Sequence, residues 1–320
     1  MTAPINPYRY RPEPTLTGPE AADKAGIDYD IAKRLNRALG MPEIDDRSVE
    51  FGERDVEVLQ ILKEMVSAGV PLDDVIAVAR VYGQSFARIA DAETRLFRDH
   101  FVMPMREQGT ATEEIEEHFE PLVTRQLDLL GKAIDYVHRR HLAVALLQLT
   151  ASPTPDSSER LAVGFVDLVD FSRITKDLHS SDLGEFIDRF EHVVIESCGD
   201  PAVRVVKMIG DAAMFVSADP QKALDAAMAI VARVAADDLL PEARSGLDAG
   251  DVVPVAGDYF GRTANVSARI TEFARPGTTV VSGALLEALG ADAVEVSRIG
   301  RRRLNGVGRV DLFKVKAESD

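Results

Sequence analysis

The feature that most constrains the fold is a change of hydrophobic period at residues 150–160, "TASPTPDSSER". Before this segment apolar residues recur at helical spacing, whereas Val-rich runs typical of strands follow it. The segment itself is rich in Pro, Ser and Thr, which indicates a linker. We therefore expect an all-helical domain over 1–149, with an extended Pro-rich arm at 1–16, a linker over 150–160 and an α+β domain over 161–320.

Helix boundaries can be recognised at the start of the chain. Thr17 and Glu20 have the spacing of a capping box, in which each residue satisfies a backbone N–H group of the other. The run "DYDIAKRLNRALG", residues 28–40, then predicts a helix that Gly40 closes, because glycine readily adopts the left-handed conformation that ends a helix.

Longer helices are expected over the rest of this half. Residues 71–109 predict one long helix bent near Pro104, and residues 110–149 predict another that opens with acidic side chains. Residues 52–69 predict a helix that ends at Gly69. Its apolar face is expected to contain Val56, Leu59, Ile61, Leu62 and Met65.

Composition excludes several classes of protein. The formal net charge is −16, so we expect no nucleic-acid partner, because such binders need a basic face. Cys198 is the only cysteine, which rules out an intramolecular disulfide and fits a reducing cytoplasm. Residues 1–20 carry no long apolar run, and no stretch approaches the roughly 18 apolar residues of a membrane helix. We expect neither a signal peptide nor a membrane span.

The second half alternates strand and helix patterns. Helices are expected near 182–196, 220–236 and 263–273, and the segment around "IGD" predicts a hairpin. Strands are expected over 160–171, 203–210, 212–218, 243–255, 278–283 and 312–316.

Two aspartates lie where such strands end. Asp167 follows the apolar run "LAVGFV", and Asp211 lies in the hairpin turn. If the strands are neighbours, the two carboxylates converge at one end of the sheet, where oxygen ligands can hold two hard cations for phosphate chemistry. From spacing alone, the alternative that each Asp only stabilises a turn is equally good.

Three segments together resemble a known family. "FVDLVDFS", "VKMIGDAAMF" and "GDYFGRTANVSARI" are similar, in order and separation, to the signature segments of the class III nucleotidyl cyclase catalytic domain, over about residues 160–316. The resemblance implies a ferredoxin-like palm with a βαββαβ core, preceded here by the helical domain. It also implies an adenylate cyclase that converts ATP to cyclic AMP and works as a homodimer with two Mg²⁺ or Mn²⁺ ions per site.

The resemblance also implies residue roles. Asp167, Asp211 and the main-chain carbonyl of Leu168 match metal ligands. Lys207 and Asp258 match the pair that reads the base, and Asn265 and Arg269 match the residues that orient the ribose and stabilise the transition state. The contacts to the phosphates match Phe171, Ser172, Arg302 and Arg303. Lys207 would donate to adenine N1 and Asp258 would accept from its N6 amine, which selects ATP over GTP. Without the motif, Lys207 and Asp258 would be interpreted as solvated surface charges.

Two positions depart from the family pattern. Asp170 stands where the family usually has Gly, in a loop whose amides face the triphosphate, and Asn305 stands where a Lys is usual. Arg302, Arg303 or Arg309 could replace the lysine contact, although a run of arginines is usually a solvated face. These departures keep open a second hypothesis, a weak or inactive nucleotide-binding sensor. A diguanylate-type cyclase ranks low because no GGDEF-like segment is present.

The helical half has a looser resemblance. Residues 49–92 are similar to the regulatory domain of soluble, pH-responsive mycobacterial-type cyclases, while a winged-helix DNA binder is disfavoured by the acidic content. His138 and His141, in "YVHRRH", could act as pH sensors because histidine titrates near pH 6.5. The alternatives are silent exposed histidines, or a small-molecule or lipid effector held by apolar helix faces that otherwise form core or dimer contacts.

Overall fold

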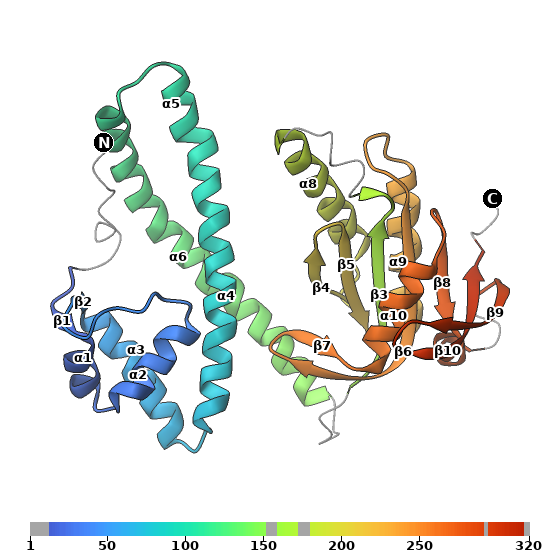
Figure 1. Ribbon diagram of the computed structural model, residues 1–320, viewed down its shortest axis with the longest axis horizontal. Coiled ribbons are helices and arrows are strands. Elements are labelled where there is room, and N and C mark those ends of the chain that lie inside the picture. Colours follow the sequence, from blue (N-terminus) through green and yellow to red (C-terminus); the bar gives the residue numbers. More distant parts are fainter. Residues whose placement is uncertain (1–12, 152–158, 172–179, 291–293, 317–320) are drawn as a thin grey trace. The chain divides into compact units, whose positions relative to one another are not determined.

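The computed structural model describes residues 13–151, 159–171, 180–290 and 294–316, and the chain divides into two compact units, 1–154 and 155–320 (Figure 1). Most of the predicted linker lies outside the described residues. The helix before it runs to Ala151 and the strand after it begins at Glu159, so both ends of the predicted linker belong to regular structure.

The first unit is built from helices and one small pair of strands. Its elements are β1 (Leu16–Thr17), α1 (Gly18–Ala25), α2 (Tyr29–Ala38), β2 (Val49–Phe51), α3 (Glu53–Ser67), α4 (Leu72–Phe97), a π-helical turn (Arg98–Val102), α5 (Met103–Glu107) and α6 (Thr112–Ala151). β1 and β2 pair antiparallel, which the expectation of an all-helical domain missed. Strands of two and three residues are too short to show the alternation that predicts a strand.

The predicted capping box is present. The Thr17 hydroxyl accepts a hydrogen bond from the Glu20 amide at 3.4 Å, and the Thr17 amide donates to the Glu20 carboxylate at 2.8 Å. Gly40 and Gly69 follow α2 and α3 with φ of +75° and +98°. Both glycines therefore end their helices as predicted.

The buried face of α3 is narrower than predicted. Val56, Leu59 and Leu62 are buried, but Ile61 and Met65 are 56% and 37% exposed. At 100° per residue, Ile61 lies about 160° around the helix from the centre of the three buried residues, and Met65 lies about 120° from it, at the edge of the exposed side. Their assignment to the apolar face was therefore wrong.

The long helix predicted over 71–109 forms with one irregularity. A π-helical turn joins α4 to α5, and the Met103 amide donates to the Arg98 carbonyl, five residues back. This wider turn lies directly before Pro104, which has no N–H group to continue the α-helical ladder. The irregularity near Pro104, predicted as a bend, is therefore a π-helical turn. The next helix, α6, continues through Pro121 in its interior.

The second unit contains one large sheet with the order β4-β5-β3-β6-β8-β10-β9, and β7 pairs with β6 (Figure 1). Its elements are β3 (Glu159–Leu168), α8 (Ser180–Ser197), β4 (Val203–Ile209), β5 (Ala212–Ser217), α9 (Pro220–Ala235), β6 (Ala243–Val255), β7 (Asp258–Phe260), α10 (Arg262–Phe273), β8 (Thr279–Ser282), α11 (Gly283–Leu289), β9 (Val296–Leu304) and β10 (Gly308–Val315). From β3 to β6 the order is βαββαβ with the ferredoxin-like arrangement, which confirms the predicted palm. β7, α11 and β9 were not predicted.

Helices cover both faces of this sheet. α8 and α9 pack on one face in a core that includes Phe190, Phe215 and Ile230. On the opposite face, α10 approaches β6 so closely that a Cβ atom at Gly246 would lie 2.3 Å from the Thr271 nitrogen. Only glycine permits this approach, which fixes the position of α10 on the sheet. None of the helices in the described ranges combines the length and the apolar character of a membrane span.

Candidate active site

Asp167 and Asp211 meet at one end of the sheet. Asp167 is the penultimate residue of β3 and pairs with Ala212 of β5, directly after Asp211 in the chain. The Leu168 amide donates to the Asp211 carbonyl at 3.0 Å, which joins the end of β3 to the β4–β5 turn. Gly210, the first of the two residues in this turn, has φ of +61°, as a tight hairpin turn of this kind requires. The two aspartates therefore converge at one end of the sheet, as expected for neighbouring strands, and their role as metal ligands stays a prediction.

An arginine that sequence reasoning did not single out contacts this pair. Arg244 of β6 lies directly opposite Asp167 and donates two hydrogen bonds to its Oδ2 atom, of 2.9 Å from Nε and 2.6 Å from Nη2. A third bond of 3.1 Å reaches the Glu272 carbonyl in α10. Arg244 thus neutralises one of the two carboxylates and ties it to α10.

Burial and charge act together on Asp211. Loss of solvation raises the pKa of Asp211, and the negative charge of Asp167 raises it further. The amide of Asp211 and the charge of Arg244 oppose this shift in pKa. The two carboxylates are therefore close enough to repel each other, as expected for groups that share cations.

The donor set is that of a partial metal site. Carboxylates and a main-chain carbonyl are ligands that Mg²⁺ and Mn²⁺ prefer. In the described parts of the chain, no cluster of three or more His, Cys, Asp or Glu side chains could hold a metal ion. Two carboxylates completed by substrate phosphates and water are the usual arrangement for Mg²⁺, so the residues fit a site that is complete only with a nucleotide.

Lys207 and Asp258 are brought together from distant parts of the chain. Lys207 of β4 forms an ion pair with Asp258 of β7, and both side chains are partly buried, at 35% and 24% exposure. The other carboxylate oxygen of Asp258 accepts from the Tyr259 amide at 2.8 Å. The expectation from the residues alone, of two solvated surface charges, does not hold.

Asn265 and Arg269 lie on one face of α10. Both are exposed, while Ala264, Val266 and Ile270 between and beside them are buried. Arg269 forms an ion pair with Glu272 three residues later. Two polar side chains four residues apart are therefore presented together on an accessible helix face.

The loop after β3 is described as far as Phe171. Asp170 is exposed and has φ of +59°, a conformation that favours glycine. The ring of Phe171 packs against Phe186 of α8 with centroids 5.5 Å apart, so its main chain rather than its ring remains for a ligand. Ser172 lies outside the described residues. The Leu168 side chain is buried and has no atom that could bind a metal ion. The main-chain carbonyl of Leu168 is therefore the group that could serve as a ligand.

The arginines near the C-terminus divide between the two faces of the sheet. Arg302 pairs with Val310 and Arg303 pairs with Arg309, so adjacent residues of β9 alternate in direction. Leu304, on the same face as Arg302, packs with Val266 and Ile270 of α10. Arg302 therefore shares a face with α10, whereas Arg303 points to the opposite face.

Known proteins resemble the chain over most of its length. A family model described as an adenylate cyclase regulatory domain matches residues 13–146. A Mycobacterium tuberculosis (strain CDC 1551 / Oshkosh) protein named pH-sensitive adenylate cyclase is 31% identical over 310 residues, which cover 93% of this chain and 77% of that protein. The chain belongs to the adenylate cyclase family.

Two further relatives agree with this assignment, and one solved structure matches at lower similarity. Proteins named adenylate cyclase from Streptomyces coelicolor and Streptomyces griseus are 33% and 32% identical, over 84% of this chain and 70% and 67% of their own lengths. The solved structure of the adenylyl cyclase CyaB from P. aeruginosa matches 51% of this cyclase and 97% of that chain, with 17% identity and a TM-score of 0.42.

The regulatory domain of this cyclase places both candidate histidines on α6. His138 and His141 are exposed, and the ring of His138 contacts that of Tyr82 from α4, with centroids 6.2 Å apart. A change of charge on His138 would therefore act at the contact between α4 and α6.

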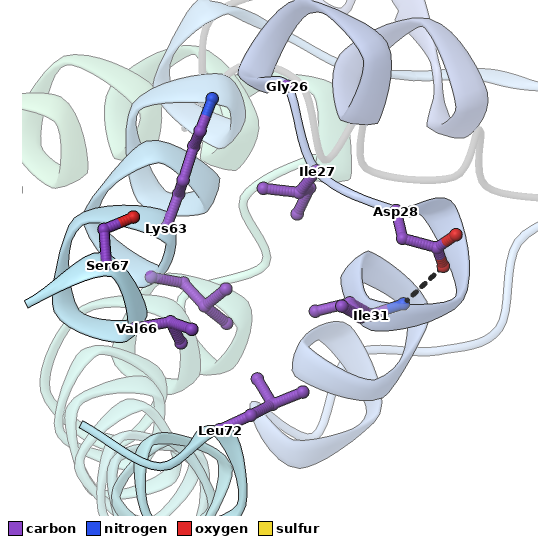
Figure 2. A pocket seen from close by; sticks show the side chains of 9 residues that line it. Gly26, Ile27, Asp28, Ile31, Lys63, Val66, Ser67 and Leu72 are labelled. Carbon is purple, nitrogen blue, oxygen red and sulfur yellow. Dashed lines mark hydrogen bonds between the residues drawn. The ribbon is translucent and has the colours of Figure 1, made fainter. Parts of the chain in front are cut away.

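The regulatory domain also contains a small pocket of about 210 Å³. Figure 2 shows that the side chains of Ile27, Ile31, Val66 and Leu72 surround it, with Lys63 at its edge. Lys63 donates to the Ala25 carbonyl at 3.5 Å, a contact that suits the C-terminus of α1. Ligand pockets usually measure about 300–1,000 Å³. This pocket is therefore too small to enclose a lipid.

Proposed function

We propose that this protein converts ATP into 3′,5′-cyclic AMP and pyrophosphate with two Mg²⁺ or Mn²⁺ ions per active site. The proposal is carried by the convergence of Asp167 and Asp211 at one end of the sheet. These carboxylates and the Leu168 carbonyl would hold the ions. When bound, such ions supply Lewis-acid activation of the ribose 3′-hydroxyl and the α-phosphate. Arg244 donates only to Oδ2 of Asp167, so this carboxylate can act as a ligand through Oδ1 while Arg244 stays in place.

Lys207 and Asp258 would read the purine. Their ion pair in the free chain keeps a donor and an acceptor next to each other in a partly buried position. Adenine offers an acceptor at N1 and a donor at N6, which matches the two side chains, whereas guanine presents the reverse pattern. A mismatch of buried polar groups can discriminate by about 10⁴-fold. ATP is therefore the proposed substrate.

Asn265 and Arg269 would act on the sugar and the reacting phosphate. The Asn265 amide can hydrogen-bond the ribose, and the Arg269 guanidinium can donate two bonds to the charge that develops on the α-phosphate. Of the two arginines proposed for the outer phosphates, we favour Arg302, because it shares the α10 face of the sheet. The exposed main chain around Asp170 would approach the same phosphates.

The active sites would form between two copies of the chain. Among the described residues, no hydrogen bond or ion pair joins Asp167 or Asp211 to Lys207 or Asp258. Exposed apolar side chains lie on the strands that carry Lys207 and Asp258 and on the neighbouring β6, namely Ile209, Val253, Val255 and Phe260. Covering them with a second copy would bury apolar surface and bring a metal-binding half-site to a base-reading half-site.

The N-terminal domain would regulate this activity in response to pH. The M. tuberculosis relative is named pH-sensitive. The contact of His138 with Tyr82 of α4 supports protons as the effector. We also place the protein in the cytoplasm, where the unpaired Cys198 would remain reduced.

An assay for cyclic AMP tests the proposal. Purified full-length protein with ATP and Mn²⁺ should release cyclic AMP and pyrophosphate in equal amounts, and Asp167→Asn or Asp211→Asn should abolish both. The Asp170 carboxylate, which adds negative charge beside the phosphate loop, favours a second candidate, a nucleotide-binding sensor without turnover. Nucleotide binding without any product would support that candidate and contradict the proposal.

A further inference from the structure

β6 and β7 form an arm that has little apolar packing on one side. Val255 pairs with Asp258 across a two-residue turn, Ala256 and Gly257, with φ of +54° and +83°. Val253, Val255 and Phe260 are 42%, 50% and 52% exposed. An element with so few buried contacts opens easily unless other contacts hold it. Asp258 therefore depends on contacts that reach the arm from the rest of the sheet.

Arg204 of β4 supplies such contacts on both sides of Asp258. Its Nη2 atom donates to the Gly257 carbonyl at 3.1 Å. Its guanidinium carbon lies 5.6 Å from the centroid of the Tyr259 ring, within the range of a cation–π interaction. A longer bond of 3.4 Å reaches the Tyr259 hydroxyl. The residues immediately before and after Asp258 are thus held by one side chain.

A bulge in β4 makes this geometry available. Residues three apart on a regular strand point to opposite faces, yet Arg204 pairs with Val216 and Lys207 pairs with Met214, which are two apart. The register shift between Val205 and Lys207 accounts for the difference. Bulges re-aim side chains in this way beside active sites. Arg204 and Lys207 consequently both reach β7.

The ring of Tyr259 links this contact to the body of the sheet. It packs against the apolar cluster that contains Val163, Met214 and Val216. Its amide donates to the Asp258 carboxylate at 2.8 Å. Contacts therefore run from Arg204 of β4 to the Tyr259 ring, and from the Tyr259 amide to the carboxylate of Asp258.

We propose that Arg204 is a positioning residue that holds Asp258 at the distance from Lys207 needed to select adenine over guanine. The proposal rests on the proposed function, since it gives Lys207 and Asp258 the task of reading the base. When a purine enters, the ion pair between Lys207 and Asp258 must open, and the contacts of Arg204 keep the main chain of 257–259 in place while it does.

The test compares Arg204→Met and Arg204→Lys with the matched control Arg233→Met in the full-length protein. Arg233 is an exposed arginine on α9 that pairs with Glu196 of α8, on the other face of the sheet. Steady-state kinetics with ATP and with GTP would give kcat and KM for each nucleotide. Hydrogen exchange read by mass spectrometry would report opening of residues 253–260 without any nucleotide.

Arg204→Met should lower the ratio of kcat/KM for ATP to that for GTP about tenfold, mainly through KM for ATP, and should speed exchange in 253–260. Arg204→Lys keeps a donor but loses the planar guanidinium, so its ratio should fall between those of the wild type and Arg204→Met. Arg233→Met should match the wild type.

Two results separate the proposals. Wild-type protein that makes no cyclic AMP from ATP would contradict the proposed function itself. An active wild type, combined with an Arg204→Met variant whose nucleotide ratio and exchange equal those of Arg233→Met, would overturn the role of Arg204 alone. Arg204→Lys guards against misfolding, because a folded lysine variant with wild-type selectivity overturns the role even if the methionine variant fails to fold.

Discussion

Arg244 and Asp167 occupy directly opposite positions on neighbouring strands, and the arginine donates two hydrogen bonds to a single carboxylate oxygen. Both side chains are largely shielded, at 25% and 23% exposure. Arg244→Gln would leave Asp167 and Asp211 facing each other without a cation. Because hydrogen bonds to charged groups contribute about 1.5–3 kcal/mol, we expect the second unit to lose about that much free energy of unfolding.

Urea unfolding in the presence of EDTA, followed by circular dichroism, would measure this loss. Arg233→Gln is the matched control, since it breaks an exposed pair with Glu196 that should contribute no more than about 1 kcal/mol. Equal shifts of the unfolding midpoint for the two variants would show that the Arg244 pair is no stronger than a surface pair.

The sequence predicted those parts of the catalytic fold whose pattern is local. Val-rich runs identified β3 to β6, and the Gly-Asp turn identified the hairpin that carries Asp211. β7 has only three residues, and β9 contains "RIGRRR", so neither shows the alternation of a half-buried strand. The composition of β7 and β9 does not predict strands, and these segments become strands because they pair with β6 and β10 in the folded domain.

The candidate site was predictable only where a motif specified it. The positions of Asp167 and Asp211 followed from strand ends and a turn. Arg244 escaped notice because its contact depends on the register between β3 and β6, which no local pattern defines. Arg204 and Lys207 both reach β7 because β4 contains a bulge. The pattern of polar and apolar residues in β4 does not show where this bulge lies.

Arg269→Ala should reduce kcat by about 10²–10³-fold and change KM for ATP little, because a group that binds developing charge stabilises mainly the transition state. Arg269 is exposed, and among the described residues its one ion pair is with Glu272 of its own helix, so its loss should not disturb the fold. Steady-state kinetics with Mn²⁺-ATP would check this. Arg275→Ala, at an exposed position just beyond α10, is the control. A fall in kcat of equal size in both variants would remove the catalytic role from Arg269.

Mixing two inactive variants tests whether sites form between chains. Asp211→Asn lacks a proposed metal ligand and Arg269→Ala lacks the arginine proposed to stabilise the transition state, so we expect neither homodimer to be active. If each site takes these residues from different copies, a mixed dimer contains one intact site, and co-expression should restore about a quarter of wild-type activity. Co-expression that yields no more cyclic AMP than the separate variants would place both residues in a site within one chain.

His138 and His141 are expected to carry the pH response of the regulatory domain. Both are exposed on α6, and charging His138 places a cation at its contact with Tyr82 of α4. Replacing both with Gln should flatten the dependence of kcat on pH. The control replaces His100 and His118, also exposed in this domain, with Gln. A pH profile equal to that of the wild type would assign the response to other groups.

Asp248 should make the catalytic domain less stable as pH rises. It is 7% exposed on β6, and the Ser282 hydroxyl donates to it. Burial raises the pKa of Asp248 in the folded state, against the opposing effects of that hydrogen bond, the Ala249 amide and the charge of Arg262. Between its unfolded and folded pKa values, the folded chain therefore holds a proton that the unfolded chain releases. Stability contributed by this group is then present at acid pH and is lost as pH rises through the folded pKa.

Asp248→Asn keeps an acceptor for Ser282 and removes the ionisation. The variant should therefore have a higher Tm than the wild type at neutral pH, and the difference should shrink as pH falls below about 3, where the wild-type carboxyl is protonated in both states. Thermal unfolding followed by circular dichroism at a series of pH values would measure both curves. Curves that run parallel, or a variant that is less stable at neutral pH, would show that Asp248 is held ionised by interactions strong enough to outweigh its burial.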